Sequence, residues 1–325
     1  MPIFPSGKPR VAITLGDPAG IGPEITLKAL RSWYSPKKAD VLLIGDPRFF
    51  ERLAKRLRLP CHSKFFFPPK VNETFPEKIK RGQSNPQLTF LAVRSIELAV
   101  CLAMQKKVDV IVTPPINKAG LKQAGFDIPG HTEYLAALSK TERFEMMLVG
   151  GGLRVVLVTR HVPIEKVAAN LSQKKIQDAI LLTDRELRKS FGIQKPRIGV
   201  CGLNPHAGEQ GTVGQEEIKM IAPAVRAVRS KVQSTLEGPL PPDVLFYKAH
   251  RGLYDAEICM YHDQGQIPLK MISRGHGVNV TLGLPFVRTS PDHGTAYDIA
   301  NKFVADSSSM IEALELGVRL FKNRR

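Results

Sequence analysis

Residues 258–270 read I-C-M-Y-H-D-Q-G-Q-I-P-L-K, and in them a short apolar run gives way at once to polar side chains. The run Ile258–Tyr261 is typical of a buried strand, and His262 is the first residue after it. In open α/β folds ligands bind beyond the carboxyl ends of the strands, so His262 is a candidate ligand or acid–base group. A single histidine in such a place is more often structural, so the interpretation depends on what other segments deliver.

On both sides of this stretch, short apolar runs alternate with longer segments in which apolar residues recur at helical spacing. This alternation predicts an α/β fold with a mostly parallel sheet that helices cover on both faces. The expected strands are residues 10–16, 41–44, 64–67, 108–112, 146–149, 153–158, 197–203, 244–247, 257–261 and 277–283. The expected helices are residues 23–34, 47–58, 86–106, 130–138, 173–190 and 310–322, with a further helix starting within 288–296 and a surface connection at 238–243.

The composition is that of a globular chain, with 325 residues of which 43% are hydrophobic and 24% charged, and two domains are expected. The four cysteines are widely spaced and form no C-x-x-C pair, which favours a reducing, cytoplasmic location. We expect neither a secreted nor a membrane protein. The N-terminus lacks a continuous apolar segment, and no later apolar run approaches the roughly 20 residues that span a bilayer.

The formal net charge of +17 allows three interpretations. Nucleic-acid binding requires a recognised module, or basic residues interleaved with stacking aromatics, and the sequence has neither signature. A positive field also attracts an anionic substrate and a dinucleotide. The simplest interpretation is a solvated basic surface.

The loop at residues 17–24, D-P-A-G-I-G-P-E, follows the first expected strand and looks like a phosphate-binding loop. However, Gly20 and Gly22 are followed by Ile25, where the dinucleotide fingerprint has Gly or Ala, and no P-loop lysine follows. The Rossmann and P-loop interpretations are therefore both rejected.

Three histidines, His161, His206 and His262, each come just after an apolar run, and parallel strands bring such ends to one edge of a sheet. Three neutral imidazoles with one open coordination position form a catalytic zinc-type site, and nitrogen ligands favour zinc, cobalt, nickel or iron over magnesium. The alternative is that each is a loop histidine bonded to a backbone carbonyl, because no local spacing rule links them.

A set of motifs in fixed order resembles the 4-hydroxythreonine-4-phosphate dehydrogenase family, which acts in pyridoxal phosphate biosynthesis. The motifs are G-D-P-A-G-I-G-P-E (16–24), P-P-I-N-K (114–118), G-H-T-E (130–133), T-R-H-V-P (159–163), L-N-P-H-A-G-E (203–209), G-P-L-P-P-D (238–243), Y-H-D-Q-G (261–265), G-V-N-V-T-L-G-L-P-F-V-R-T-S (277–290) and D-H-G-T-A (292–296). One departure is Gln210, which stands where the family usually has Gly.

This resemblance implies a two-domain α/β/α homodimer, related in fold to isocitrate and isopropylmalate dehydrogenases, with the active site in the interdomain cleft and shared between subunits. The implied first domain comprises residues 1–127 and 272–325, and the second, residues 128–271, carries the metal ligands and dimer contacts. The implied site residues fall into three groups. They are the metal ligands His161, His206 and His262, the substrate residues His131, Thr132, Lys270, Asn279 and Arg288, and the cofactor residues His293, Gly294 and Asp298.

The implied activity is oxidation of 4-phosphohydroxy-L-threonine by NAD or NADP. The cofactors are that dinucleotide and one divalent metal, for which we favour zinc, with cobalt and magnesium as alternatives. A bound cation lowers the pKa of a substrate hydroxyl, and the β-keto acid that forms loses CO2 when its enolate is stabilised, for which Lys270 is the candidate. Asp263 is the candidate general base, with orientation of a histidine as its alternative role and Asp243 as the second choice.

Two other functions remain open from the sequence. A sister group of dehydrogenases, which acts on erythronate or threonate 4-phosphate, shares the histidines and most motifs. A basic nucleic-acid-binding protein is the remote alternative, and it would leave the three strand-end histidines unexplained.

Overall fold

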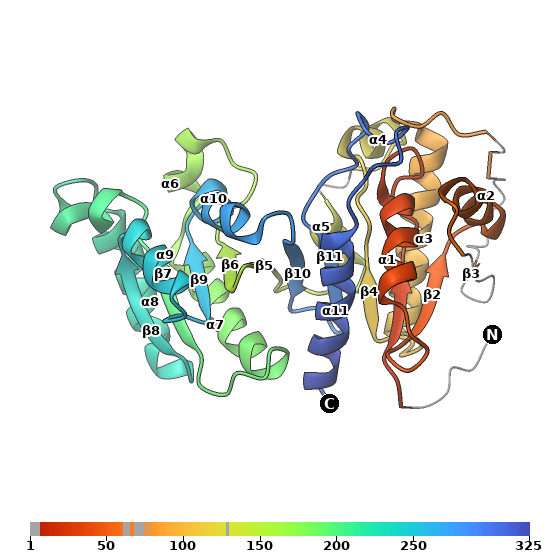
Figure 1. Cartoon of the computed structure of the whole chain (residues 1–325). Coiled ribbons are helices and arrows are strands. Elements are labelled where there is room, and N and C mark those ends of the chain that lie inside the picture. Colours follow the sequence, from red (N-terminus) through yellow and green to blue (C-terminus); the bar gives the residue numbers. More distant parts are fainter. Residues whose placement is uncertain (1–6, 61–65, 68–74, 77, 128–129) are drawn as a thin grey trace. The chain divides into compact units, whose positions relative to one another are not determined.

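The computed structural model describes every residue except 1–6, 61–65, 68–74, 77 and 128–129 (Figure 1). The chain forms two compact units. Unit 1 comprises Met1–Glu142 with Leu284–Lys322, and unit 2 comprises Arg143–Gly283 with Asn323–Arg325. The division expected from the sequence differs from this one in placing 128–142 in the second domain, and 272–283 and 323–325 in the first.

Unit 1 contains a parallel sheet whose described strands lie in the order β3-β2-β1-β4-β11. These strands are β1 (Arg10–Ile13), β2 (Asp40–Ile44), β3 (Phe66–Phe67), β4 (Val110–Val112) and β11 (Val287–Pro291). In β1, Val11, Ala12 and Ile13 are all 0% exposed. Because successive side chains of a strand point to opposite faces, the sheet is covered on both sides, as the apolar runs predicted.

Two of the described helices of unit 1, α2 and α3, begin with a side-chain cap followed by proline. The helices are α1 (Gly22–Trp33), α2 (Pro47–Leu57), α3 (Pro86–Met104), α4 (Lys118–Gln123), α5 (His131–Leu138) and α11 (Ser308–Asn323). The Asp46 and Asn85 side chains accept hydrogen bonds from the first-turn N–H groups of α2 and α3, and proline occupies the next position in each helix.

Helix α3 bears on the expectation that no apolar run approaches the length needed to span a bilayer. It is 19 residues long and, among the described residues, is the one helix both long and apolar enough to cross a membrane. Arg94 and Glu97 interrupt the run, so it did not stand out in the sequence. Most of the helix is buried inside the unit, as in the core helix of a globular domain.

Unit 2 contains a mixed sheet with the strand order β10-β5-β6-β9-β7-β8 in its described residues. The strands are β5 (Glu145–Gly150), β6 (Leu153–Leu157), β7 (Arg197–Cys201), β8 (Thr235–Leu240), β9 (Ala256–Cys259) and β10 (Val278–Leu282). The pairs β10–β5 and β5–β6 are antiparallel, whereas β6, β9, β7 and β8 run parallel to one another. The chain turns from β5 to β6 at Gly151 and Gly152, which both have positive φ.

The helices of unit 2 are α6 (Val167–Asn170), α7 (Gln173–Lys189), α8 (Ala222–Val228), α9 (Pro242–His250) and α10 (His262–Ser273). The Ser172 side chain caps α7 by accepting a hydrogen bond from Lys175 N. Two units of alternating strands and helices confirm the predicted α/β class.

Three expected elements are wrong. Residues 244–247 belong to helix α9, because Pro242 and Asp243 start a helix in which Leu245, Phe246 and Ala249 are buried at helical spacing. Much of the expected surface connection at 238–243 is the end of β8. The segment expected to start a helix, 288–296, begins as β11, whose five residues are all buried even though three are polar.

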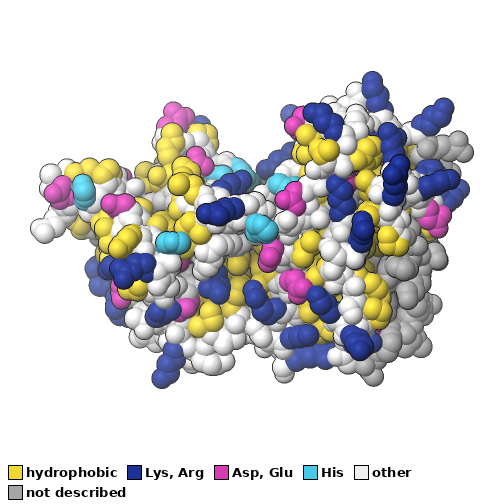
Figure 2. All heavy atoms as spheres, viewed as in Figure 1, with side chains coloured by type: hydrophobic (Ala, Val, Ile, Leu, Met, Phe, Trp, Pro, Cys, Tyr) yellow, Lys and Arg dark blue, Asp and Glu magenta, His cyan; other side chains and the backbone are white. Residues whose placement is uncertain are grey.

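Basic side chains lie on both units in the face that Figure 2 shows, and acidic side chains are interspersed among the basic ones. Several are paired in the structure, such as Arg10 with Asp109 at 2.7 Å and Arg197 with Asp255 at 3.0 Å. This distribution agrees with the interpretation of the net charge as a solvated basic surface.

Candidate active site

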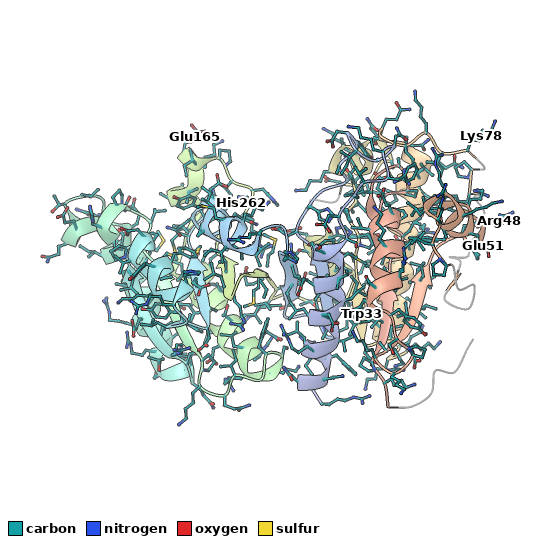
Figure 3. The ribbon with its side chains drawn as sticks, viewed as in Figure 1. Trp33, Arg48, Glu51, Lys78, Glu165 and His262 are labelled. Atoms are coloured by element: carbon teal, nitrogen blue, oxygen red, sulfur yellow. The ribbon has the colours of Figure 1, made fainter. Side chains whose placement is uncertain are left out.

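The three strand-end histidines all lie in unit 2, after neighbouring parallel strands. His161 follows β6, His262 follows β9 and His206 follows β7, and the strand order is β6-β9-β7. Figure 3 shows His262 at the start of α10. The carboxyl ends of these strands therefore deliver imidazoles to one edge of the sheet, as the sequence predicted.

Two of these histidines, His161 and His262, line the same cavity. The ring centroids of His161 and His262 are 5.8 Å apart, close enough for both rings to bind one ligand. The cavity has a volume of about 360 Å³. Its lining residues are Arg160, His161, Val162, Pro163, Ile164, Val167, Tyr261, His262 and Asp263.

Asp263 fixes the ring of His262. Its Oδ1 lies 2.6 Å from His262 Nδ1. Because a carboxylate only accepts hydrogen bonds, Nδ1 carries a proton, and in the neutral ring Nε2 has the lone pair. A histidine whose second nitrogen bonds a carboxylate is typical of metal sites. The contact favours the orienting role for Asp263 over direct proton transfer.

Arg160, which precedes His161, is held by two residues that do not line the cavity, Phe144 and Glu145. Its Nη2 donates to Glu145 Oε2 at 2.8 Å and to Phe144 O at 3.3 Å, and its guanidinium lies over the Phe144 ring. Burial raises the pKa of Glu145, and Arg160 opposes that shift. The contacts anchor the T-R-H segment to the start of β5.

His206 does not line this cavity. Its side chain is exposed, within the tightly coiled segment Pro205–Gly211 that follows β7. Within the described part of the chain, no three His, Cys, Asp or Glu side chains converge as metal ligands. One chain thus brings two of the three predicted ligands together. The imidazole pair and the Asp263 contact fit a zinc-type donor set, and the three-histidine ligand set stays a prediction.

The other predicted residues of unit 2 differ in how exposed their side chains are. Lys270 is exposed, eight residues along α10 from His262, or about 12 Å along the helix axis. Asn279 is half-buried in β10, opposite Leu148. Asp243, the second choice for a base, is exposed in the first turn of α9.

In unit 1, the buried guanidinium of Arg288 acts electrostatically on the ring of His131. Arg288 is 2% exposed, and its Nε and Nη2 donate to Thr113 Oγ1 at 3.2 and 2.6 Å. Burial lowers the pKa of Arg288 to about 9, which Glu133 partly opposes, so Arg288 is still charged at neutral pH. Sequence reasoning missed Thr113, although it directly follows β4 and so occupies a strand-end position.

His131 has a polar atom without a partner. Its Nε2 is buried and has no hydrogen-bond partner among the described residues, although the side chain as a whole is only partly buried. Burial lowers its pKa well below the usual value, and the charge of Arg288 lowers it further. His131 is therefore neutral, and with Thr132 it stands at the N-terminus of α5. Such an end binds anions.

The segment around His293, Gly294 and Asp298 is an irregular loop between β11 and α11. His293 Nδ1 lies 3.0 Å from Gly294 O, its Nε2 is buried with no partner in the described residues, and Asp298 is exposed. Tyr297 Oη donates a hydrogen bond to Asp17, a buried carboxyl in the 16–24 loop. Burial raises the pKa of Asp17, and the Tyr297 bond opposes that shift.

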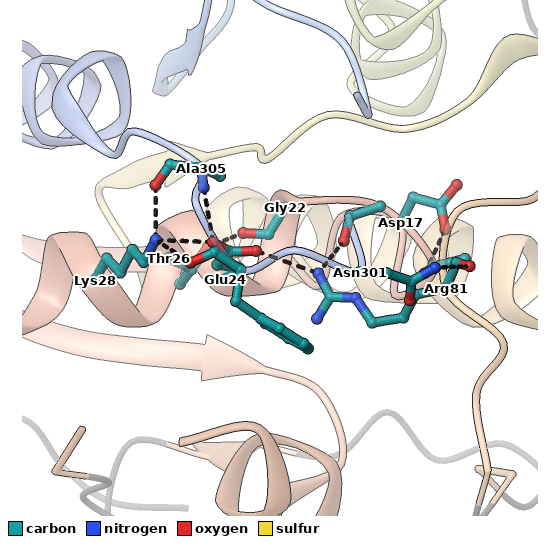
Figure 4. A network of polar contacts seen from close by, with 11 residues as sticks. Asp17, Gly22, Glu24, Thr26, Lys28, Arg81, Asn301 and Ala305 are labelled. Atoms are coloured by element: carbon teal, nitrogen blue, oxygen red, sulfur yellow. Dashed lines mark hydrogen bonds and ion pairs between the residues drawn. The ribbon is translucent and has the colours of Figure 1, made fainter. Parts of the chain in front are cut away.

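A buried network fastens the far end of this loop to α1 (Figure 4). Glu24 is 0% exposed, and its Oε1 accepts from Lys28 Nζ at 2.8 Å and from Ala305 N at 2.9 Å. Arg81 donates to Gly20 O at 2.8 Å and lies 4.7 Å over the Phe303 ring. The G-D-P-A-G-I-G-P-E motif therefore supports the loop of His293, a connection that the sequence did not reveal.

Comparison with known proteins decides the family. The model of the family described as pyridoxal phosphate biosynthetic protein PdxA matches residues 37–317. The chain belongs to this family. A relative from Desulfosudis oleivorans, "4-hydroxythreonine-4-phosphate dehydrogenase", is 43% identical, with 96% of each chain covered.

Two further PdxA relatives bear on fold and substrate. The crystal structure of 4-hydroxythreonine-4-phosphate dehydrogenase from Klebsiella pneumoniae has a TM-score of 0.85 and 40% identity, and the match covers 97% of this chain and 100% of that one. A relative from Cupriavidus necator, 41% identical over 97% of this chain and 98% of its own, is "D-threonate 4-phosphate dehydrogenase". The resemblance inferred from the motifs is thus confirmed. Relatives named for different substrates have similar sequence identity to this chain, 43% and 41%.

Proposed function

We propose that this PdxA-family protein oxidises 4-phosphohydroxy-L-threonine with NAD or NADP in pyridoxal phosphate biosynthesis. The product is a β-keto acid that decarboxylates to 3-amino-2-oxopropyl phosphate. One observation carries the proposal: in a chain of this family, His161 and His262 face one cavity at the ends of neighbouring parallel strands. The relatives named for this reaction support the choice of substrate.

His161, His206 and His262 would hold one divalent metal, for which we favour zinc, with cobalt and magnesium as alternatives. Imidazole nitrogen donors disfavour magnesium among the three. When bound, the metal supplies Lewis-acid chemistry that makes a substrate hydroxyl easier to deprotonate. Asp263 keeps His262 Nε2 available to the cavity by accepting the Nδ1 proton's hydrogen bond. Asp263 is also the candidate proton acceptor, with Asp243 second, since both are exposed carboxylates of unit 2.

The substrate phosphate would be bound by Arg288, which keeps its charge in a buried setting where electrostatic attraction is strong. Neutral His131 and Thr132 would add hydrogen bonds at the α5 N-terminus rather than charge. Lys270 and Asn279 would bind the rest of the substrate, and Lys270 would stabilise the enolate that decarboxylation produces.

The dinucleotide would bind along the loop that contains His293, Gly294 and Asp298. The buried, unpartnered Nε2 of His293 supports a polar ligand there. The Asp17–Tyr297 bond and the Glu24 network would hold that loop in one shape. The absence of a Rossmann fingerprint from the sequence is consistent with this different location.

The protein would act as a homodimer in which a second copy supplies His206. Large exposed hydrophobic side chains of the described residues lie mainly in unit 2. They are Ile164, Val213, Ile218, Val244, Tyr247, Leu253, Ile267 and Met271. Exposed apolar side chains in one unit are groups that a subunit interface would cover.

The buried free thiols Cys201 and Cys259 agree with a reducing cytoplasm; Cys61 lies outside the described residues.

The competing substrates are threonate and erythronate 4-phosphates, and the D-threonate 4-phosphate dehydrogenase relative favours including them. The deciding assay follows NAD and NADP reduction, and CO2 release, by zinc-loaded protein with each substrate. We expect kcat/KM for 4-phosphohydroxy-L-threonine to exceed the others at least about 100-fold, because a site built for the amino group leaves its polar partners unpaired otherwise. Preference for threonate 4-phosphate would establish the alternative, and no reduction with any substrate would reject both.

A further inference from the structure

The loop after β7 holds His206 in a backbone conformation that ordinary residues avoid. From His206 to Gln210 every residue has a positive φ, between 42° and 80°, and only Gly208 among them is a glycine. L-residues disfavour this left-handed region because Cβ crowds the following carbonyl oxygen. A run of such residues persists only where surrounding groups fix it. A group outside the run therefore has to hold His206 in place.

We propose that Glu217 is this group, a positioning residue that shapes the His206 loop for ligand binding. Glu217 lies outside the cavity between His161 and His262, so it would act through the backbone of the loop and not by touching a ligand. The inference rests on the proposed function, because it gives His206 the role of a metal ligand.

Glu217 makes its contacts where the chain leaves β7. It starts the turn Glu217–Ile221, which leads into α8, and it is 3% exposed. Its Oε1 accepts hydrogen bonds from Leu203 N and Asn204 N, both at 2.7 Å. Its Oε2 accepts one from Asn204 Nδ2 at 3.0 Å. One buried carboxylate thus satisfies three donors on the two residues that lead into Pro205 and His206.

Two glycines let the carboxylate come this close. A Cβ at Gly202 would lie 3.1 Å from Glu217 Oε1, and a Cβ at Gly208 would lie 2.6 Å from Oε2. Gly208 also has a φ of 80°, which favours glycine. The loop is therefore closed around the Glu217 carboxylate from both sides, and a side chain at either glycine would push the two apart.

Two other acids show what is particular to Glu217. Glu216 accepts from Asn204 Nδ2 at 2.7 Å and from Gln215 N at 3.0 Å, contacts that leave the Leu203 and Asn204 amides to Glu217. Glu186 in α7 is buried to the same degree, at 2% exposure, and accepts from Ser190 Oγ at 2.6 Å. Glu186 is therefore a matched control for loss of a buried carboxylate elsewhere in unit 2.

The test uses the purified full-length protein and two measurements: Zn²⁺ affinity by competition with a chelator, and hydrogen–deuterium exchange of residues 203–213. Glu217→Ala should weaken Zn²⁺ binding about 10- to 100-fold and speed exchange of this segment. Glu217→Gln keeps an acceptor oxygen for the two backbone amides, so both effects should be smaller. Glu186→Ala should lower the melting temperature without changing the Zn²⁺ affinity.

His206→Ala separates this inference from the proposed function. If His206→Ala weakens Zn²⁺ binding and Glu217→Ala does not, the inference is overturned and the metal site stands. If His206→Ala binds Zn²⁺ as the wild type does, the metal role of His206 fails. Hydrogen–deuterium exchange of residues 203–213 in Glu217→Ala then decides whether Glu217 holds the loop. Faster exchange than in the wild type supports that role, and unchanged exchange overturns it. Should Glu217→Ala not fold, unchanged affinity and exchange in Glu217→Gln overturn the inference instead.

Discussion

Glu257 is a carboxyl group in the interior of β9, and it couples the stability of unit 2 to pH. It is 1% exposed, and its Oε2 accepts a hydrogen bond from Arg154 N at 3.1 Å. Burial raises its pKa from 4.5 to about 8, and Arg154 only partly opposes this. The folded chain therefore keeps a proton on Glu257 that the unfolded chain releases above about pH 4.5.

The sign of the resulting pH dependence is fixed. The free energy of unfolding that Glu257 contributes is complete below pH 4.5 and is lost as the pH rises through about 8. Glutamine cannot ionise, so we expect Glu257→Gln to reduce the fall in the free energy of unfolding with rising pH, by at most roughly 5 kcal/mol. Urea unfolding at about pH 5, 7 and 9 measures it. The exposed Glu51→Gln should keep the wild-type slope, and an unchanged slope in Glu257→Gln would contradict the prediction.

At the scale of elements, Gln264 ties two strand ends together. It lies in the first turn of α10 and is 8% exposed. Its Oε1 accepts from Met260 N at 2.6 Å, just after β9, and its Nε2 donates to Gly202 O at 2.7 Å, just after β7. The strands that lead to His262 and His206 are thus linked by one side-chain amide.

Removing that amide should destabilise the protein. Gln264→Leu leaves a buried N–H and a buried carbonyl without partners, so we expect a loss of about 2 kcal/mol in the free energy of unfolding. Gln266 is a matched control on the same helix, since it is 6% exposed and its Oε1 has no hydrogen-bond partner among the described residues. Gln266→Leu should cost less than Gln264→Leu in urea unfolding. Equal losses would mean that the strand-end link contributes nothing.

Elements were predictable from the sequence where local pattern and burial agreed. The runs that became β1, β2 and β7, and the capped helices α2, α3 and α7, fall within a few residues of the expected bounds. Helix α9 was missed because V-L-F-Y has high strand propensity, while the Pro242 start and tertiary packing decide for helix. Strand β11 was missed because its Arg, Thr and Ser are buried only by partners distant in the sequence.

The candidate site was predictable as a set of residues but not as a geometry. Strand ends pointed to His161 and His262, and the structure brings them together. The left-handed loop that keeps His206 apart has no sequence signal beyond Gly208, because four of its five residues are not glycine. Thr113 and Tyr297 contact partners 175 and 280 residues away, whereas Glu217 contacts residues 13 and 14 positions before it. None of the three belongs to a recognisable motif of its own.

At the scale of the whole molecule, the proposed sharing of the site between two copies predicts complementation. A dimer of His206→Ala with His262→Ala chains would contain one complete set of three histidines. Random mixing should therefore restore about a quarter of wild-type activity, since half the dimers are mixed and each has one intact site. His161→Ala mixed with His262→Ala lacks an intact pair in every copy and should stay inactive. No recovery in the first mixture would place all three ligands in one chain.

The discontinuity of unit 1 has a consequence for the order in which the protein is made. Its strand β4 pairs with β11, with Val110 beside Val287, and the whole of Arg143–Gly283 lies between them in the chain. On the ribosome, residues 143–283 of unit 2 are therefore synthesised while β4 still lacks one neighbour. Such a long-range pairing is slow to form, and until β11 emerges the growing chain exposes an apolar sheet edge that can recruit other chains.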